Sequence, residues 1–398
     1  MNCILQLNSK LGRKFWVEVT DRLPEDWDPW IARFSVSNYL QSSVFVGFES
    51  RVRSGKALYI TAYFPDKGEI VGRLLAFVEA LRCDFFLESD FRRSFLPLFN
   101  RLPRRLFWID GPVLDEALAL DEALYVFLKA IDRVSKKWNV YTISHASLPH
   151  YADCPGSGEA ESILRDFGYE AEPWLSYVID LDQDEETLWK SLKQDARNKV
   201  RKAKGRKLRF TEVEDGESLK KYYSIFLQHR RRNRLNVTFG FHHLCDLFFS
   251  DREGIRYFLV LDGEHPVAGQ GGYIFHKTMH RVMSAVSDYS VLNRVYGGEL
   301  LQWEIIRWAR ENGLKRYDLA GAADHPKTSK EENIKAFKSK FGGQEISYRL
   351  FYKKRLGWLA EIKRLTTYGL FCGVRVLTTF YDRGIYSEHG THPRERQG

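Results

Sequence analysis

The strongest chemical signal in the sequence is the positive charge of residues 189–209. Apolar residues recur there at helical spacings, which predicts one stripe of an amphipathic helix: Trp189, Leu192, Ala196, Val200 and Ala203. The other positions are mostly Lys and Arg, and Asp195 is the single acid. Because solvated helix faces usually mix both signs, the pattern favours a phosphate-binding surface, with a solvated face as the alternative. The predicted phosphate-binding residues are Lys193, Arg197, Arg201 and Lys204.

A second basic cluster follows at residues 230–234, where Asn233 is the only residue that is not Arg. A guanidinium group can donate two parallel hydrogen bonds to paired phosphate oxygens. If both clusters flank one cleft, they could hold a tRNA backbone or the pyrophosphate of a nucleotide sugar. Binding of either would weaken steeply with salt, because each neutralised phosphate releases counterions.

Other kinds of chemistry lack their motifs. No Gly-x-x-x-x-Gly-Lys-Ser/Thr sequence is present, which excludes a P-loop nucleotidase, and no Gly-x-Ser-x-Gly elbow supports a serine hydrolase. The histidine pairs His242/His243 and His276/His280 have no carboxylate or Cys partner at ligand spacing. We therefore expect no metal site and no resident cofactor.

Composition sets wider limits. A chain of 398 residues with 44% hydrophobic residues is long enough for two domains. Its net charge of +9 favours anionic partners. The N-terminus does not read as a signal peptide, and no stretch offers the roughly 18 apolar residues of a membrane-spanning helix. We expect a cytoplasmic protein, and the inner face of the plasma membrane is a second expected location.

The two halves of the sequence echo each other. In the first half, a strand at 106–110, a loop, a helix over 119–137 and a strand at 140–144 follow in order. In the second half the same order is a strand at 282–287, a loop, a helix over 300–311 and a strand from 315. A short helix and a final strand then complete each half, at 163–180 and 336–351.

Two spacings support a duplication. Tyr141 and Tyr317 lie 176 positions apart, and Phe167 and Phe341 lie 174 apart. We expect each sheet to begin with a strand pair, at 45–64 and 255–287, with a tight turn at Asp262-Gly263. The predicted fold class is α/β with mixed sheets. The expected units are residues 1–178, 179–350 and a C-terminal helical segment with a disordered tail at 351–398.

This order of elements resembles a GNAT N-acyltransferase, and two in tandem resemble the FemABX family of aminoacyl-tRNA-dependent transferases. The local similarities lie at Gly111-Pro-Val-Leu-Asp115, at 188–204, along the helix 300–313, at Tyr317-Asp-Leu-Ala-Gly and at Phe337-Lys-x-x-Phe-Gly-Gly. Together they cover roughly residues 100–350. The long helical arm of some members has no counterpart here, because no sustained heptad pattern occurs.

The resemblance implies transfer of an aminoacyl group from a charged tRNA to an amine of a peptidoglycan precursor, a step in cell-wall biogenesis that affects cell shape. In the family, an aromatic residue and a lysine at the positions of Phe337 and Lys338 serve the aminoacyl-tRNA end. The chemistry agrees, because acyl transfer passes through an oxyanion that a fixed cation stabilises. An aromatic face can also stack on a terminal base.

The attacking amine must lose a proton, and Asp115 and Asp288 are the expected catalytic carboxylates. Asp318 is a further candidate, although its position inside a strand also suits a buried structural carboxylate. Substrate groups or water could take the proton instead. The expected substrate-binding residues are Phe337, Arg230, Arg234, Tyr289 and Arg294.

Two other functions remain open. One is an acyl-CoA-dependent N-acetyltransferase that acts on an amino sugar or small amine, since Arg294 to Glu299 partly resembles a pyrophosphate-binding loop. Glu299 argues against it, because a carboxylate there would repel pyrophosphate. The other is a non-catalytic nucleic-acid-binding protein that uses the same basic surface. An amphipathic pattern from 355 onward suggests packing on the first half or peripheral contact with a membrane. The oligomeric state stays undetermined.

Overall fold

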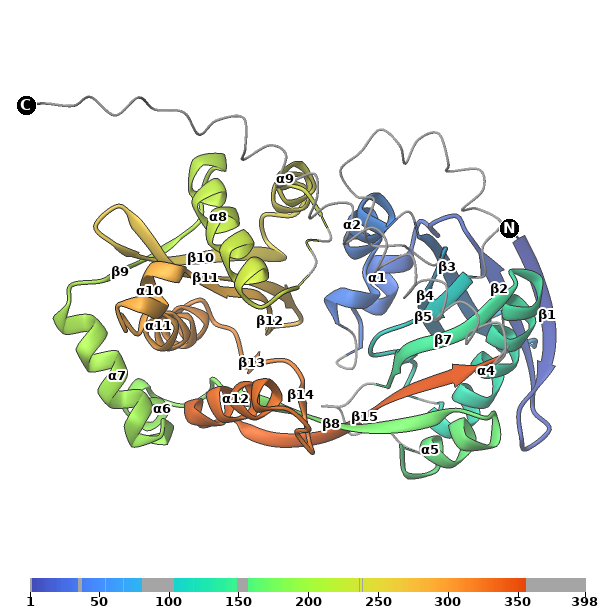
Figure 1. Ribbon diagram of the computed structural model, residues 1–398. Coiled ribbons are helices and arrows are strands. Elements are labelled where there is room, and N and C mark those ends of the chain that lie inside the picture. The colour runs from blue at the N-terminus through green and yellow to red at the C-terminus, as the bar shows by residue number, and fades with distance from the viewer. Residues whose placement is uncertain are drawn as a thin grey trace, which may run out of the picture.

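The computed structural model describes residues 2–34, 38–53, 55–66, 68–80, 104–116, 118–148, 157–235, 237 and 239–355. These residues form two α/β lobes that share one continuous mixed sheet (Figure 1). The strand order along the sheet is β1-β2-β3-β4-β5-β7-β15-β8-β13-β12-β11-β10-β9. The predicted α/β fold class with a duplicated architecture is confirmed.

The first lobe contains most of the elements up to residue 166. Its strands are β1 (Asn2–Asn8), β2 (Lys14–Thr20), β3 (Lys56–Tyr63), β4 (Ile70–Ala80), β5 (Arg104–Phe107), β6 (Val113–Leu114) and β7 (Val140–Ser147). Its helices are α1 (Trp27–Ile31), α2 (Ser43–Arg53), α4 (Leu120–Lys137) and α5 (Ser157–Asp166), with a 3-10 turn at Tyr39–Gln41. Strands β5 and β7 run parallel, and the other neighbouring strands are antiparallel.

The second lobe repeats this plan. Its helices are α6 (Glu185–Ser191), α7 (Gln194–Gly205), α8 (Gly216–Arg232), α9 (Phe241–Ser250), α10 (Asp288–Leu292), α11 (Gly297–Glu311) and α12 (Ser329–Lys338), followed by a 3-10 turn at Ser339–Phe341. Its strands are β9 (Arg209–Glu212), β10 (Ile255–Asp262), β11 (His265–Phe275), β12 (Thr278–Val286), β13 (Arg316–Asp318) and β14 (Ala322–Ala323). Strands β12 and β13 form its parallel pair, as β5 and β7 do in the first lobe.

The lobes exchange their last strands. Strand β8 (Glu170–Asp180) follows the first lobe in sequence, yet its C-terminal part pairs with β13 and β14 of the second lobe. Strand β15 (Gln344–Lys354) follows the second lobe, yet its C-terminal part pairs with β7 of the first. Between these ends, β8 and β15 pair with each other in an antiparallel ladder from Glu170↔Tyr352 to Val178↔Gln344. In Figure 1 the two strands form the band that joins the lobes.

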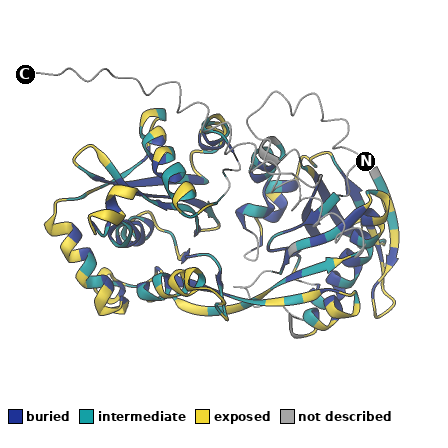
Figure 2. Ribbon diagram, in the orientation of Figure 1, coloured by how far each residue is buried: buried dark blue, intermediate teal, exposed yellow. Residues whose placement is uncertain are grey.

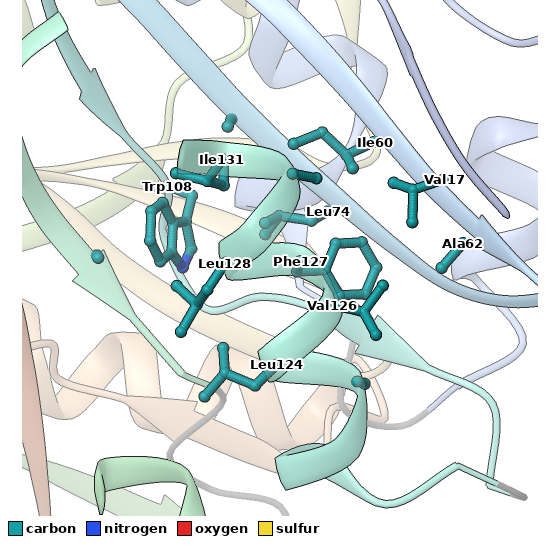
Figure 3. Packing of buried hydrophobic residues seen from close by; sticks show 14 of the residues in the cluster. Val17, Ile60, Ala62, Leu74, Trp108, Leu124, Val126, Phe127, Leu128 and Ile131 are labelled. Atoms are coloured by element: carbon teal, nitrogen blue, oxygen red, sulfur yellow. The ribbon is translucent and has the colours of Figure 1, made fainter. Parts of the chain in front are cut away.

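Three hydrophobic clusters hold the fold. Helix α4 packs its apolar face on the first-lobe sheet, where Phe127, Leu128 and Ile131 meet Leu74 and neighbouring side chains (Figure 3). Acids in the first turn of α4 and lysines in its last turn suit the helix dipole. A second cluster packs α7 and α11 against β10 to β13. The third joins the lobes through aromatic residues, and Tyr39 of the first lobe stacks on Tyr273 of the second with centroids 4.5 Å apart.

Several predicted elements are confirmed. The helix expected over 119–137 is α4, the helix expected over 300–311 lies within α11, and the turn at Asp262-Gly263 joins β10 to β11. Gly263 has a φ of +58°, a left-handed conformation that glycine adopts without strain. Among the described residues, no helix is both long and apolar enough to cross a lipid bilayer.

Other predictions were wrong. Residues 45–64 do not form a strand pair, because 43–53 is helix α2, which turns Phe45 into the aromatic cluster between the lobes. The helix expected over 189–209 is broken after Ser191, and α7 covers only its middle. Residues 351–354 belong to strand β15 and are not helical. Residues 356–398 lie outside the described residues. The expected domain boundaries at 178 and 350 fall inside strands β8 and β15.

The strand exchange predicts that Phe351, although it follows the second lobe in sequence, stabilises the first lobe. Phe351 is buried in the first-lobe cluster, so Phe351→Ala should lower the free energy of unfolding by about 3–5 kcal/mol. Hydrogen exchange followed by mass spectrometry should show lost protection in β7 and α4. The exposed Leu292→Ala serves as a control that leaves both unchanged. Loss of protection confined to residues after 180 would contradict the exchange.

Candidate active site

The parallel pair β12 and β13 opens partway along its length. The two strands pair only from Thr278↔Arg316 to His280↔Asp318. Beyond this point β13 ends, and β12 continues to Val286 without a neighbour on that side. Residues 281–286 therefore lie at the centre of the second lobe, where the carbonyl oxygens of Met283 and Val286 accept hydrogen bonds from the side chains of Tyr222 and Arg232.

A β-bulge shapes this part of β12. The register against β11 shifts between Gly269 and Gly271, and Met283 has a φ of +48°. In a regular strand Arg281 and Ser284 would point to opposite faces. The extra residue lets the side chains of Arg281 and Ser284 reach the same partner. Arg281 Nε and Ser284 Oγ both donate hydrogen bonds to Gln270 Oε1, at 2.9 and 3.0 Å.

Gln270 extends this contact into a buried polar network. Its Nε2 donates to the hydroxyl of Tyr317 at 2.5 Å, and Gln302 Nε2 donates to the same hydroxyl at 2.6 Å. Burial raises the pKa of Tyr317, so this hydroxyl stays neutral. The network fixes the position of Arg281, whose own pKa is lowered by burial. A fixed guanidinium thus faces the opening beside β12.

Lys338 is the second cation at this position. Its side chain is only 5% exposed, and its Nζ donates to the carbonyl oxygens of Ala320 and Gly321 at 2.8 and 2.7 Å. Burial, reinforced by the charge of Arg281 and opposed by that of Asp318, lowers the pKa of Lys338 to about 7. An amine with this pKa changes its protonation state near neutral pH.

The turn that receives Lys338 is tightly built. Asp318 is buried, accepts hydrogen bonds from the Ser176 hydroxyl and from the backbone N–H of Ala320, and lies 3.4 Å from His280 Nδ1. Ala320 adopts a φ of +63°, which costs energy for a residue with a side chain. Of the two interpretations of Asp318 offered by the sequence, a catalytic base or a buried structural carboxylate, its contacts match the second.

Gly321 and Tyr348 close the other side of this turn. A side chain at Gly321 would overlap the hydroxyl of Tyr348 and the ring of Trp174. Burial raises the pKa of Tyr348, and the charges of Asp110 in the first lobe and Asp318 in the second raise it further. The pKa of Tyr348, on strand β15, is therefore raised by carboxylates from both lobes.

Phe337 lies beside this group at the end of α12. Its ring packs edge-on against Phe341 at 5.2 Å, and the guanidinium carbon of Arg281 lies 5.6 Å from its centre. Helix α12 begins at a capping box formed by Thr328 and Glu331. The helix thus presents Phe337 and Lys338 to the same cation, Arg281.

A pocket of about 340 Å³ lies between the lobes next to the bulge. Phe and Tyr side chains form much of its wall, and its polar lining includes Glu49, Arg230 and Ser284. His229 also lines it, and burial lowers the pKa of this imidazole to about 4, helped by nearby Arg232 and Arg230. Ser284 belongs to both the pocket and the network of Gln270, so the pocket adjoins the group around Arg281. The full lining is Phe45, Phe48, Glu49, Phe226, His229, Arg230, Phe239, Tyr273, Val282, Met283 and Ser284.

The two expected catalytic carboxylates, Asp115 and Asp288, contact residues other than Lys338. Asp115 is in the first lobe just after β6, where its backbone N–H donates to Val71. Asp288 begins α10 and pairs with Arg232. Their role in proton transfer stays a prediction. Among the described residues, no group of three His, Cys, Asp or Glu side chains could hold a metal ion.

The expected substrate-binding residues are scattered. Arg230 lines the interlobe pocket, and burial lowers its pKa. Tyr289 instead contacts Arg206 and Asp262 through its hydroxyl, at 2.7 and 3.1 Å. Arg234 and Arg294 are exposed, and both have positive φ angles. Only Arg230 and Phe337 of this set lie next to the network built on β12.

The basic helix α7 is partly neutralised by acids of α11. Lys204 pairs with Glu304 at 2.8 Å, and Lys199 lies 3.6 Å from Glu299. The Arg197 guanidinium donates to the backbone carbonyls of Lys190 and Leu192, which precede α7, and to the side chain of Gln194. Lys193 and Arg201 are exposed, and Lys193 Nζ donates to Ser339 Oγ next to Lys338. The four predicted phosphate-binding residues therefore differ in how much positive charge they would present to a phosphate group.

The sequence reading missed Arg281, Gln270 and Tyr348. Nothing in the strand pattern marks Arg281, since a single Arg in a strand is usually exposed. A weak signal was present at Gln270, a polar residue inside the glycine run of a buried strand. A groove between the two lobes was expected from the duplication, but most of the residues that line the pocket could not be foreseen, because they come from segments far apart in the sequence.

Residues 190–328 match the model of the acetyltransferase (GNAT) domain. No curated protein matches the chain in sequence. Among solved structures, the fold is similar to a crystal structure of FemX, with a TM-score of 0.60 and 14% identity over 83% of this chain and 96% of that one. It is also similar to the C-terminal domain of a putative lysylphosphatidylglycerol synthetase from Agrobacterium fabrum, with a TM-score of 0.51 and 13% identity over 86% and 94% of the chains. L-PGS from Bacillus licheniformis gives a TM-score of 0.51 and 12% identity over 86% and 96%.

The chain therefore has a tandem GNAT fold that resembles FemX, and the expectation of a FemABX-like architecture is confirmed. The domain match in the second half, together with this fold, supports an acyltransferase. The group around Lys338 and Arg281 lies where the parallel strands of that half diverge.

The electrostatic coupling in this group gives a direct test. Replacing Arg281 with Gln removes a cation that lowers the pKa of Lys338, so this pKa should rise above about 7. Competitive labelling of Lys338 with an amine reagent across pH, read by mass spectrometry, measures the change. The Arg201→Gln variant removes a cation that contacts Asn198 and Trp189 instead, so it should leave the pKa of Lys338 as it is. An unchanged labelling curve in Arg281→Gln would contradict the coupling.

Proposed function

We propose that the protein transfers an aminoacyl group from an aminoacyl-tRNA to an amine of a peptidoglycan-type cell-envelope precursor. The observation that carries the proposal is the buried Lys338, held beside Arg281 and Phe337 where β12 and β13 diverge. The fold similarity to FemX and to a putative lysylphosphatidylglycerol synthetase supports aminoacyl transfer in the cell envelope.

Lys338 serves the developing oxyanion in this proposal. A neutral lysine amine has two N–H groups, and both are matched by the carbonyls of Ala320 and Gly321. Protonation adds a third N–H together with a positive charge. This third donor can meet the ester oxygen that becomes negative when the amine attacks. The acceptor nitrogen then forms an amide, and the tRNA leaves with its terminal hydroxyl restored.

The interlobe pocket is the proposed acceptor site. Its aromatic walls can hold an apolar portion of the acceptor, while Glu49 and Arg230 offer opposite charges for an ammonium and a carboxylate. A peptide stem carries both of these groups. Asp115 and Asp288 remain the proposed acceptors of the amine proton, and exposed α7 cations are the proposed contacts to the tRNA backbone.

A second candidate is an acyl-CoA-dependent N-acetyltransferase. The Glu299 carboxylate at the start of α11 lies 3.6 Å from Lys199 and 3.8 Å from Lys340, so its charge is largely offset. The repulsion that was expected against a pyrophosphate is therefore weak. Calorimetry with acetyl-CoA and with charged tRNA separates the two donors, because saturable binding of acetyl-CoA alone would select this candidate.

Removing the Lys338 amine should slow transfer. We expect Lys338→Met to lower kcat/KM by about 100-fold or more, as for loss of one oxyanion donor. In the wild type, the contribution of protonated Lys338 should fall as the pH rises through about 7, because the free enzyme then loses the charge. The Lys338→Met variant should lack this limb of the pH profile. A kcat/KM equal to the wild-type value would exclude the role.

Salt dependence tests the α7 surface. Lys193→Gln or Arg201→Gln should each reduce the slope of log Kd against log salt for tRNA by roughly 0.9, since each removes one phosphate contact. Lys204→Gln is the matched control, because Lys204 already pairs with Glu304. Equal effects of all three substitutions, or none, would contradict a tRNA path along the exposed side of α7.

A further inference from the structure

The turn between β1 and β2 presents an exposed leucine on a well-ordered tip. Leu11 is 83% exposed. Ser9 closes the turn, because its backbone N–H donates to Arg13 O at 2.8 Å and its hydroxyl accepts from Arg13 N at 3.2 Å. The tip projects from the edge of the first lobe and is exposed along its length (Figures 1 and 2). Single exposed leucines are common on protein surfaces, so the case for a partner depends on the residues around Leu11.

Basic residues surround this leucine. Lys10 precedes it, and Arg13 and Lys14 follow after Gly12. All three are exposed. Arg13 pairs with Glu122 at 3.3 Å and lies over the ring of Phe64. Lys10 and Lys14 are therefore the cations beside Leu11 that suit the boundary of an anionic membrane, where acyl chains lie below negatively charged headgroups.

Further apolar residues continue from the tip along the hairpin. Trp16 is 46% exposed and Ile4 is 72% exposed, and the register places both on the face away from α4. Tryptophan side chains favour the interface between lipid and water. The hairpin thus carries Leu11 at its end and the aromatic Trp16 further along β2.

A basic groove adjoins the hairpin. Its volume is about 410 Å³, and it lies between β1 and α4. Lys129, Arg133 and Lys136 line it, and the one acid in its lining, Asp132, lies within 3.5 Å of nitrogen atoms of Lys136, Lys353 and Arg355. The acid is therefore offset, and the groove has a positive balance suited to a phosphate headgroup.

We infer that the tip of the β1–β2 hairpin docks the protein on an anionic phospholipid surface through Leu11, Lys10 and Lys14, whereas the basic groove lies on the α4 side of the hairpin, opposite Trp16. The inference goes beyond the proposed function and does not depend on it. Charge complementarity selects this partner over a second copy of the chain, because two such hairpins would bring like charges together. A soluble polyanion would use the cations but would leave Leu11 and Trp16 in water.

Vesicle cosedimentation of the full chain tests the inference. The probes are phosphatidylcholine vesicles with and without phosphatidylglycerol. We expect binding only to the anionic vesicles and weaker binding at higher salt. Leu11→Ser should weaken it about tenfold through the lost apolar contact. Lys10→Gln and Lys14→Gln should each weaken it about fivefold.

The control is Leu292→Ser, since Leu292 is 81% exposed but lies in the second lobe. This variant should bind as the wild type does, and thermal unfolding should be unchanged in all variants. Wild-type failure to bind anionic vesicles, or full binding by Leu11→Ser, would overturn the inference. So would a concentration-dependent dimer in analytical ultracentrifugation that Leu11→Ser dissociates, because the tip would then serve a second copy. Transfer activity on a water-soluble acceptor reports on the proposed function separately.

Discussion

The antiparallel ladder between β8 and β15 is the interaction on which the rest of the structure depends. It carries each lobe's final strand to the parallel strand of the other lobe and so makes a single sheet. The ladder also sets the position of Lys338, because only the 3-10 turn and two glycines separate this residue from β15. Gly342, with a φ of +78°, leaves no space for a side chain against Ser191, and Gly343 packs on the backbone of Val178. The end of α12 is thereby fixed against β8.

The buried lysine shows how the fold adjusts an amine. Burial and the charge of Arg281 lower the pKa of Lys338, and the charge of Asp318 raises it. The balance lies near neutral pH. The turn whose carbonyl oxygens accept hydrogen bonds from Lys338 holds Ala320 at a positive φ, and the side chain of Asp318 stabilises it through the N–H of Ala320. Backbone strain and a tuned amine therefore occur in the same few residues.

Much of the fold could be predicted from the sequence, because periodic patterns mark α4 and α11 and a duplicated order of elements marks the two lobes. The strand exchange could not, since a repeat shows which strands exist but not which copy each one pairs with. Helix α2 was misread because Val44, Phe45, Val46 and Phe48 form an apolar run as short as a strand. Its conformation is decided by packing between the lobes, which no local pattern records.

The candidate site was predicted only in part. Lys338 and Phe337 were found through a family resemblance, and the structure places both beside Arg281, a residue with no sequence signal. The charge of α7 was overestimated, because Glu299 and Glu304 lie on a helix about a hundred residues away in sequence. Contacts of this kind depend on tertiary structure, and the periodicity of a single segment cannot reveal them.

The crossing of the last strands also bears on how the protein is made. Strand β7 is complete by residue 147, but its neighbour β15 ends at residue 354. During translation, an early-emerging lobe would therefore wait with an open β-edge and an incomplete core until nearly the whole chain has left the ribosome. Such a protein depends on uninterrupted synthesis, and a nascent chain halted midway would be a target for chaperones or aggregation.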